Sequence, residues 1–206
     1  MGTNLNIEIK KNIGIFGGAF NPIHIGHINI ALSALNEENI DEIWFLPSFK
    51  PPHKDFDEIL NFKYRFEMVD LAIKNIVNFK NLDLEKKLYD ENKIDITNTY
   101  EVLKNIKNIY KNYSFNLIIG LDSLYQIDTW VNFENLIKEN KFIVANRLLV
   151  ENTEISKYNI DYKILNNEII NISSTEIREN IKNKNFLLKF LNKDVIKYIK
   201  DNKLYV

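Results

Sequence analysis

Apolar residues recur along this chain with two periods. Short apolar runs predict buried strands over residues 12–16, 42–47, 115–119 and 141–145. Between them, apolar positions three or four residues apart predict amphipathic helices over residues 27–38, 65–77, 99–110, 133–140, 174–182 and 194–201. The segment 82–89 is interpreted as one more strand, and the Lys- and Asn-rich stretch 182–185 as a loop.

Strands that alternate with helices favour parallel pairing through right-handed crossovers. The pattern therefore predicts an α/β fold, an open parallel sheet with helices on both faces and a small helical piece at the C-terminal end. The chain has 206 residues, of which 45% are hydrophobic, enough for one core. Because no stretch resembles a linker, we expect a single domain over residues 1–206.

The charge and composition exclude several classes of function. With 27 basic and 28 acidic side chains, the net charge of -1 gives no field that would attract nucleic acid or an anionic membrane. The absence of cysteine excludes disulfides, Cys-ligated metals and thiol nucleophiles. No apolar run approaches the roughly 18 residues of a membrane span, and the N-terminus has no signal-peptide core. We expect a cytosolic protein, with the nucleus as the alternative, and the sequence leaves open whether it forms a homo-oligomer.

The scarcer residue types gather where chemistry is expected. The chain is rich in Asn, Ile and Lys, yet all three histidines precede residue 54 and five of six glycines precede residue 27. Arginine occurs only at positions 65, 147 and 178. A composition biased against these types makes each of them a better candidate for a required role.

The first candidate site follows the first predicted strand, where residues 14–27 read GIFGGAFNPIHIGH. Ligands of open parallel sheets bind outside the carboxyl ends of the strands. Gly17 and Gly18 let the backbone approach a ligand there. His24 and His27 lie one helical turn apart and can donate hydrogen bonds to phosphate beside a helix N-terminus. The alternatives are a simple tight turn and a pair of metal ligands, for which no third ligand is evident.

The segment GGAFNPIHIGH resembles the signature of the nucleotidyltransferases that carry a His-x-Gly-His motif. Its long lead-in is most similar to that of the nicotinate-mononucleotide adenylyltransferases, whereas pantetheine-phosphate adenylyltransferases and cytidylyltransferases share only part of it. The resemblance implies a Rossmann-like fold and transfer of the adenylyl group of ATP to nicotinate mononucleotide, with Mg²⁺ arriving on ATP. It also implies that ATP is bound at Gly17, Gly18, Phe20 and Asn21.

Two further strand ends carry segments found in the same family. Pro51-Pro52-His53-Lys54 follows the second strand, and the resemblance implies that His53 and Lys54, with Arg147, bind the mononucleotide phosphate. A rigid surface loop is the alternative. Gly120 and Asp122 follow another strand, and the resemblance assigns them to the nucleotide ribose. The alternative for Asp122 is an ordinary helix N-cap.

The acceptor ring is assigned to residues later in the chain. The resemblance places Thr99 at the carboxylate of the nicotinate ring and stacks Trp130 on that ring. Asn98 stands where the family has an aromatic residue, and Thr97 is an alternative helix cap. Trp130 is alternatively a core residue.

The segment Asn171-Ile172-Ser173-Ser174-Thr175-Glu176-Ile177-Arg178 is the second strong motif. Ser173 and Glu176 have the spacing of a capping box, so a well-capped helix is the simplest interpretation. The family has Ile-Ser-x-Thr-x-Ile-Arg here, which implies that Ser173, Ser174, Thr175 and Arg178 grip the triphosphate. Family-like segments continue to Leu204-Tyr205, nearly the end of the chain.

The reaction that the resemblance implies needs no covalent nucleophile. The mononucleotide phosphate is already an anion, so catalysis is positioning and charge neutralisation. We assign His24, His27 and Arg178 as catalytic residues, with ATP and nicotinate mononucleotide as partners and no metal held by the protein alone. The alternatives are nicotinamide mononucleotide as acceptor, transfer to phosphopantetheine, and a non-catalytic nucleotide sensor.

Overall fold

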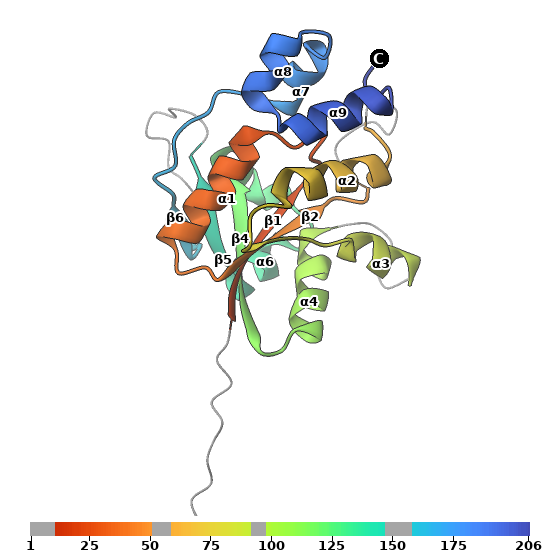
Figure 1. The fold of residues 1–206 in the computed structure, drawn as a ribbon. Coiled ribbons are helices and arrows are strands. Elements are labelled where there is room, and N and C mark those ends of the chain that lie inside the picture. The colour runs from red at the N-terminus through yellow and green to blue at the C-terminus, as the bar shows by residue number, and fades with distance from the viewer. Residues whose placement is uncertain (1–10, 51–58, 92–97, 147–157) are drawn as a thin grey trace, which may run out of the picture.

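The computed structural model describes residues 11–50, 59–91, 98–146 and 158–206. Within these residues, one parallel sheet has the strand order β3-β2-β1-β4-β5-β6 (Figure 1). The strands are β1 (Lys11–Gly18), β2 (Glu42–Pro47), β3 (Phe79–Asn81), β4 (Tyr113–Gly120), β5 (Lys141–Ala145) and β6 (Tyr162–Ile164). The strands continue outward from β1 through β2 to β3 on one side, and from β4 through β5 to β6 on the other. The switch point at which such sheets bind ligands therefore lies at the carboxyl ends of these two neighbours.

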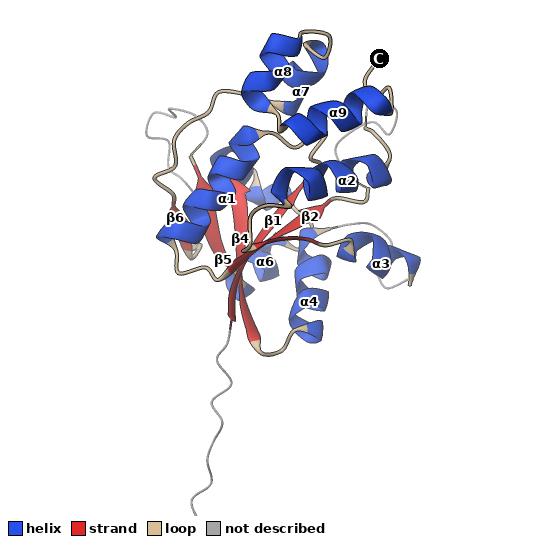
Figure 2. Ribbon diagram, viewed as in Figure 1, coloured by secondary structure: helices blue, strands red, loops and turns tan. Residues whose placement is uncertain are grey.

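Helices cover both faces of the sheet (Figure 2). The helices against one face are α1 (Ile25–Glu37), α2 (Phe62–Ile73), α7 (Ser174–Glu179), α8 (Lys184–Phe190) and α9 (Lys193–Asp201). Those against the other are α3 (Leu84–Asp90), α4 (Thr99–Ile109), α5 (Leu121–Tyr125), the 3-10 helix η2 (Ile127–Thr129) and α6 (Phe133–Glu139). Successive strand residues alternate between the two cores, because side chains of a strand alternate in direction. The predicted Rossmann-like α/β fold is confirmed.

The three C-terminal helices belong to the larger of the two cores. Ile177, Leu187 and Val195 are buried in the same cluster as Met68 and Val69 of α2. Figure 1 shows these helices at the end of the sheet toward which β1 runs. The helical piece predicted at the C-terminus therefore lies beside the carboxyl ends of the strands, where the candidate site is expected.

Two local predictions are wrong. The segment 82–89, predicted as a strand, contributes instead to helix α3, because Leu84 and Leu88 are spaced for one helix face and Leu88 is buried under it. The stretch 182–185 was expected to be a loop, but α8 begins inside it, and the Asn183 side chain accepts a hydrogen bond from the amide of Phe186 as its cap.

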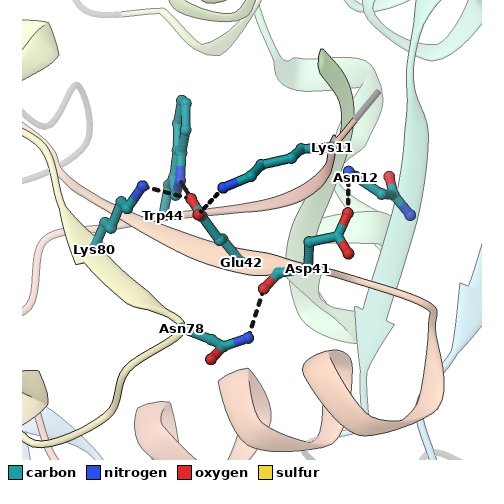
Figure 3. Close-up of polar contacts among 7 residues, drawn as sticks. All are labelled: Lys11, Asn12, Asp41, Glu42, Trp44, Asn78 and Lys80. Atoms are coloured by element: carbon teal, nitrogen blue, oxygen red, sulfur yellow. Dashed lines mark hydrogen bonds and ion pairs between the residues drawn. The ribbon is translucent and has the colours of Figure 1, made fainter. Parts of the chain in front are cut away.

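The amino ends of the strands are joined by a partly buried carboxylate (Figure 3). Glu42 of β2 accepts hydrogen bonds from Lys11 of β1 at 2.6 Å and from the Trp44 indole at 2.9 Å. It also pairs with Lys80 of β3 at 2.8 Å. Burial alone would raise the pKa of Glu42, but the bonds from Lys11, Lys80 and Trp44 outweigh it and lower that pKa to about 2. One carboxylate thus links three neighbouring strands.

Asp41 extends this network toward the backbone. Its carboxylate accepts from the amide of Asn12 at 2.7 Å, and its carbonyl accepts from the Asn78 side chain at 2.8 Å (Figure 3). The side chain of Asn12 donates in turn to the carbonyl of Asn39 at 2.9 Å. The end of the sheet opposite the candidate site is therefore fixed by polar contacts among adjacent strands.

We expect Glu42→Gln to lower the free energy of unfolding at pH 7 by about 1 kcal/mol, since both lysine partners are half-exposed. The folded pKa lies below the unfolded one, so the stabilisation is present above pH 4.5 and is lost as the pH falls toward 2. Urea unfolding of both proteins at pH 7 and pH 3 measures this. A difference of equal size at the two pH values would contradict the assignment.

Candidate active site

The two histidines of the first motif lie in contact where β1 leads into α1, with their ring planes tilted by 34°. His24 directly precedes α1 and is buried, and His27 lies in its first turn and is half-buried. Their ring centroids are 3.7 Å apart. The backbone amide of His24 donates to Nδ1 of His27 at 3.2 Å. A ring nitrogen that accepts carries no proton, so neutral His27 holds its proton on Nε2 and offers an N–H donor there.

Phe20 lies beneath this pair rather than on the surface of the site. Its side chain is only 2% exposed, and its ring meets that of His27 edge-on at 5.1 Å. Phe16 and Phe45 pack against it from the core. The backbone of Phe20 has a φ of 45°, which turns the chain sharply after the two glycines. The side chain of Phe20 therefore packs against the imidazole of His27, and its assignment to ATP stays a prediction.

Asn21 is also turned into the protein, with an exposed fraction of 1%. Its side-chain oxygen accepts a hydrogen bond from the hydroxyl of Tyr205 at 2.9 Å, and its carbonyl accepts from Arg178 at 3.0 Å. The next carbonyl, that of Pro22, accepts from the hydroxyl of Ser174 at 2.9 Å. The second sequence motif and the end of the chain are thus fastened to the first motif.

Helix α7 is capped by Ser173, and its first turn lies against the first motif. The Ser173 hydroxyl accepts from the amide of Glu176 at 3.1 Å, so the capping interpretation is correct. Arg178 donates to the hydroxyl of Thr175 at 3.2 Å. Ser173 and Thr175 are exposed and Arg178 is half-buried. Their polar groups therefore lie at the surface beside the two histidines, whereas the hydroxyl of Ser174 is directed at the loop.

Gly120 and Asp122 lie across the switch point from Gly17 and Gly18. Gly120 ends β4, the strand paired with β1, and Asp122 follows in the first turn of α5 with an exposed side chain. The residue at the N-cap position is Gly120, so the alternative interpretation of Asp122 as an N-cap is wrong. Its carboxylate is exposed next to the strand end where a nucleotide ribose was expected.

The residues assigned to the acceptor ring lie on the other helical layer. Thr99 is the first residue of α4, and the helix is capped by Asn98, whose side chain accepts from the amide of Glu101 at 2.9 Å. Asn98 therefore has a structural use at the position where the family has an aromatic residue. Trp130 directly follows η2 and is half-buried against the core under α4 to α6. His53, Lys54 and Arg147, and also Thr97, lie outside the described residues.

Sequence reasoning missed two polar side chains that support the first motif from within the protein, the buried Arg65 and the partly buried Tyr205. Arg65 of α2 is 1% exposed and donates to the carbonyl of Ala19 at 2.7 Å. Burial lowers its pKa to about 10, an effect partly offset by Tyr205 and Glu85, so the guanidinium stays charged at neutral pH. Burial also raises the pKa of Tyr205, which keeps its hydroxyl a donor to Asn21. The scarcity of arginine was the signal that pointed to Arg65.

Glu85 of α3 is a buried acidic residue whose charge interacts with that of Arg65. Its carboxylate accepts a hydrogen bond from the amide of Phe49 at 2.9 Å, in the loop after β2. Burial raises the pKa of Glu85 to about 7, although the bond from Phe49 and the charge of Arg65 both oppose that rise. The loop after β2 is therefore held by a carboxyl group that titrates near neutrality.

Comparison with known proteins agrees with this arrangement. A family model described as cytidylyltransferase-like matches residues 15–180. A probable nicotinate-nucleotide adenylyltransferase of Clostridium acetobutylicum is 37% identical over 95% of this chain and 100% of its own length. The protein of the same description from Borreliella burgdorferi is 37% identical over 94% of this chain and 96% of its own length. The chain belongs to the nicotinate-nucleotide adenylyltransferase family.

The fold comparison leads to the same family. The solved structure of Plasmodium falciparum nicotinic acid mononucleotide adenylyltransferase complexed with NaAD matches with a TM-score of 0.80 at 29% identity, over 95% of this chain and 97% of that one. The resemblance seen in GGAFNPIHIGH is thereby confirmed as membership of the nicotinate-nucleotide adenylyltransferase family. In the described part of the chain, no helix has the length and apolar character needed to cross a bilayer.

The titration of Glu85 should be visible in the stability of the protein. The folded pKa of about 7 lies above the unfolded value of 4.5, so the wild-type protein loses stability as the pH rises through this range. Glu85→Gln has no such proton. We expect the free energy of unfolding of the wild type, relative to Glu85→Gln, to fall between pH 4.5 and pH 7 in urea titrations. A pH-independent difference would contradict the buried carboxyl.

Proposed function

We propose that this chain transfers the adenylyl group of ATP to nicotinate mononucleotide, giving nicotinate adenine dinucleotide and pyrophosphate in NAD biosynthesis. The observation that carries the proposal is the contact of Arg178 with the carbonyl of Asn21 at 3.0 Å. It joins the His-x-Gly-His segment to the Ser-Ser-Thr segment beside the carboxyl end of β1. The two segments lie about 150 residues apart in the sequence. Both are suited to bind phosphate, and the family has both.

The reaction requires an in-line displacement at phosphorus. A phosphate oxygen of nicotinate mononucleotide forms a bond to the α-phosphorus of ATP, while the bond from that phosphorus to the oxygen bridging the α- and β-phosphates breaks. The electron pair of the broken bond leaves with pyrophosphate. Negative charge gathers on the bridging and leaving oxygens, so donors positioned there accelerate the step.

The assignments of His24, His27 and Arg178 follow from this charge movement. His27 offers its Nε2 proton to the α-phosphate, and His24 supports it through ring contact and through its backbone amide. Arg178, with Ser173 and Thr175, holds the departing pyrophosphate, and Gly17 and Gly18 allow the triphosphate to approach the strand end. Asp122 and Gly120 are assigned to the ribose. Phe20, Asn21 and Ser174 support this surface from below, consistent with their buried contacts.

The acceptor is assigned to the side of the switch point next to α4 and η2. Thr99 would receive the ring carboxylate of nicotinate, and Trp130 would stack on the ring. His53 and Lys54, together with Arg147, would bind the phosphate of the mononucleotide. The relatives from Clostridium and Borreliella and the Plasmodium enzyme support nicotinate as the acceptor through the names they carry.

We propose that Mg²⁺ arrives at this site with ATP. Mg²⁺ is commonly bound through phosphates and one or two carboxylates and keeps several waters. Among the residues that the structure describes, no group of three His, Asp or Glu side chains lies together in a way suited to a metal. When bound, Mg²⁺ would neutralise phosphate charge on the leaving pyrophosphate.

We further propose that residues 1–206 act as one nucleotidyltransferase domain in the cytosol. The continuity of the core from β1 to α9 supports a single unit, as does the match over the whole length of the Clostridium relative. The net charge of -1 supports small-molecule partners rather than nucleic acid. Assembly into a homo-oligomer stays a prediction.

The acceptor is tested by measuring pyrophosphate release from ATP and Mg²⁺ with nicotinate mononucleotide, nicotinamide mononucleotide or phosphopantetheine. We expect the highest kcat/KM with nicotinate mononucleotide, because Thr99 and Trp130 would engage its ring. Preference for phosphopantetheine would keep the fold and refute these two assignments. ATP binding without turnover of any acceptor would favour a nucleotide sensor.

His27→Ala should lower kcat by about 100-fold or more, the scale for removing one donor to a charged transition state. Asn36→Ala, an exposed position on the same helix α1, is the matched control and should leave kcat unchanged. Steady-state kinetics at saturating substrates measure both variants. A kcat near that of the wild type in His27→Ala would remove His27 from the catalytic residues.

A further inference from the structure

Arg65 holds three backbone carbonyls from three separate segments. Its Nε donates to Leu60 at 2.8 Å, Nη1 to Ala19 at 2.7 Å and Nη2 to Ser48 at 2.7 Å. The side chain is 1% exposed, so these bonds form away from solvent. A buried cation is costly unless its donors are satisfied, and here each guanidinium nitrogen has a carbonyl partner.

Two of the three carbonyls belong to the two loops that would carry the substrates. Ala19 directly follows Gly17 and Gly18 in the loop that leads to His24. Ser48 directly follows β2 and precedes the segment Pro51-Pro52-His53-Lys54 in the sequence. The amide of Ser48 also donates to the carbonyl of Gly18 at 2.9 Å, so the two loops touch where Arg65 grips them. One side chain therefore binds both loops at the point where they meet.

The loop after β2 has a second support from α3. Glu85 is buried and accepts from the amide of Phe49 at 2.9 Å. The ring of Phe49 lies against Phe62 at 5.5 Å and Tyr89 at 5.1 Å. The charges of Arg65 and Glu85 attract each other across this loop. The segment 48–50 is thus held from both α2 and α3.

We propose that Arg65 and Glu85 are positioning residues, which together fix the acceptor-side loop at 48–50 relative to the ATP-side loop at 17–24. The proposal rests on the function proposed above, because it assigns the two loops to the two substrates. Neither side chain reaches the surface where substrate would bind, so both act through the backbone. Arg65 touches both loops and Glu85 touches only the acceptor-side loop.

Arginine is required at position 65 by geometry. A guanidinium directs its donors along a planar fork, whereas the three donors of a lysine radiate from one nitrogen at the end of a longer flexible stem. A lysine therefore cannot reach carbonyls on three sides at once. This chain uses lysine at 24 of its 27 basic positions. The arginine at position 65 matches three carbonyls that a planar, forked donor group can bind together.

The decisive experiment compares Arg65→Lys, Glu85→Ala and Glu85→Gln with Lys63→Met, a control at an exposed position on the same helix α2. For each variant, kcat and the KM of ATP and of nicotinate mononucleotide are measured, along with the Tm. Arg65→Lys should lower kcat/KM by about 100-fold for both substrates, the scale of a misplacement of about 1 Å. Lys63→Met should match the wild type.

The two Glu85 variants separate positioning from general stability. Glu85→Ala leaves the amide of Phe49 without its partner, so the KM of nicotinate mononucleotide should rise by about tenfold, with the KM of ATP changed by less than about twofold. Glu85→Gln keeps an oxygen that can accept from Phe49 and should restore both values. A role limited to stability would lower the Tm and leave the KM values of the folded protein unchanged.

Several outcomes would overturn the proposal. A folded Arg65→Lys with kcat/KM within twofold of the wild type would do so, as would a Glu85→Ala that raises both KM values equally. If Arg65→Lys does not fold, the Glu85 series decides. If the wild type does not turn over nicotinate mononucleotide, the proposed function fails on its own. Calorimetric titration with ATP then decides the positioning role, with weaker binding expected for Arg65→Lys and unchanged binding overturning it.

Discussion

The site depends on hydrogen bonds that occupy the carbonyl oxygens of the loop after β1. A surface that binds phosphate must turn donors toward the anion and remove acceptors that would repel it. The carbonyls of Ala19, Asn21 and Pro22 all accept hydrogen bonds from within the protein, given by two arginines and a serine. Because α2 and α7 supply these donors, the shape of the loop depends on helices that are distant from it in the sequence.

This constraint explains why the C-terminal helices pack where they do. The buried faces of α7 and α9 share a core with α1 and α2, which places the start of α7 and the final tyrosine against the loop. The hydroxyl of Tyr205 holds the side chain of Asn21 across 184 residues of sequence. Hydrophobic burial supplies the energy of this docking, and the few polar bonds fix its register.

The fold was largely predictable because its signals are local. The periods of apolar residues identified four of the described strands, and the glycine and histidine segment fell at a strand end. The short strand at Tyr162–Ile164 was not predicted, because its side chains are half-buried or exposed and form no apolar run. Residues 82–89 were predicted as a strand because a short apolar run is compatible with either a strand or a helix. The scarcity of arginine marked position 65, but the contacts that Arg65 and Tyr205 make were not predictable, since periodicity carries no information about contacts between distant segments.

The spacing within the His-x-Gly-His segment shows how closely the site is packed. A Cβ atom at Gly26 would lie 3.0 Å from Nδ1 of His24 and 3.4 Å from Cγ2 of Ile172, so a side chain there would displace the His24 ring. The ring of His24 contacts that of His27, and the amide of His24 determines which nitrogen of His27 carries the proton. A glycine without contact to any reacting atom thus helps set the hydrogen-bond donor. In a reaction that depends on positioning and charge neutralisation, such packing constraints help to place the donor.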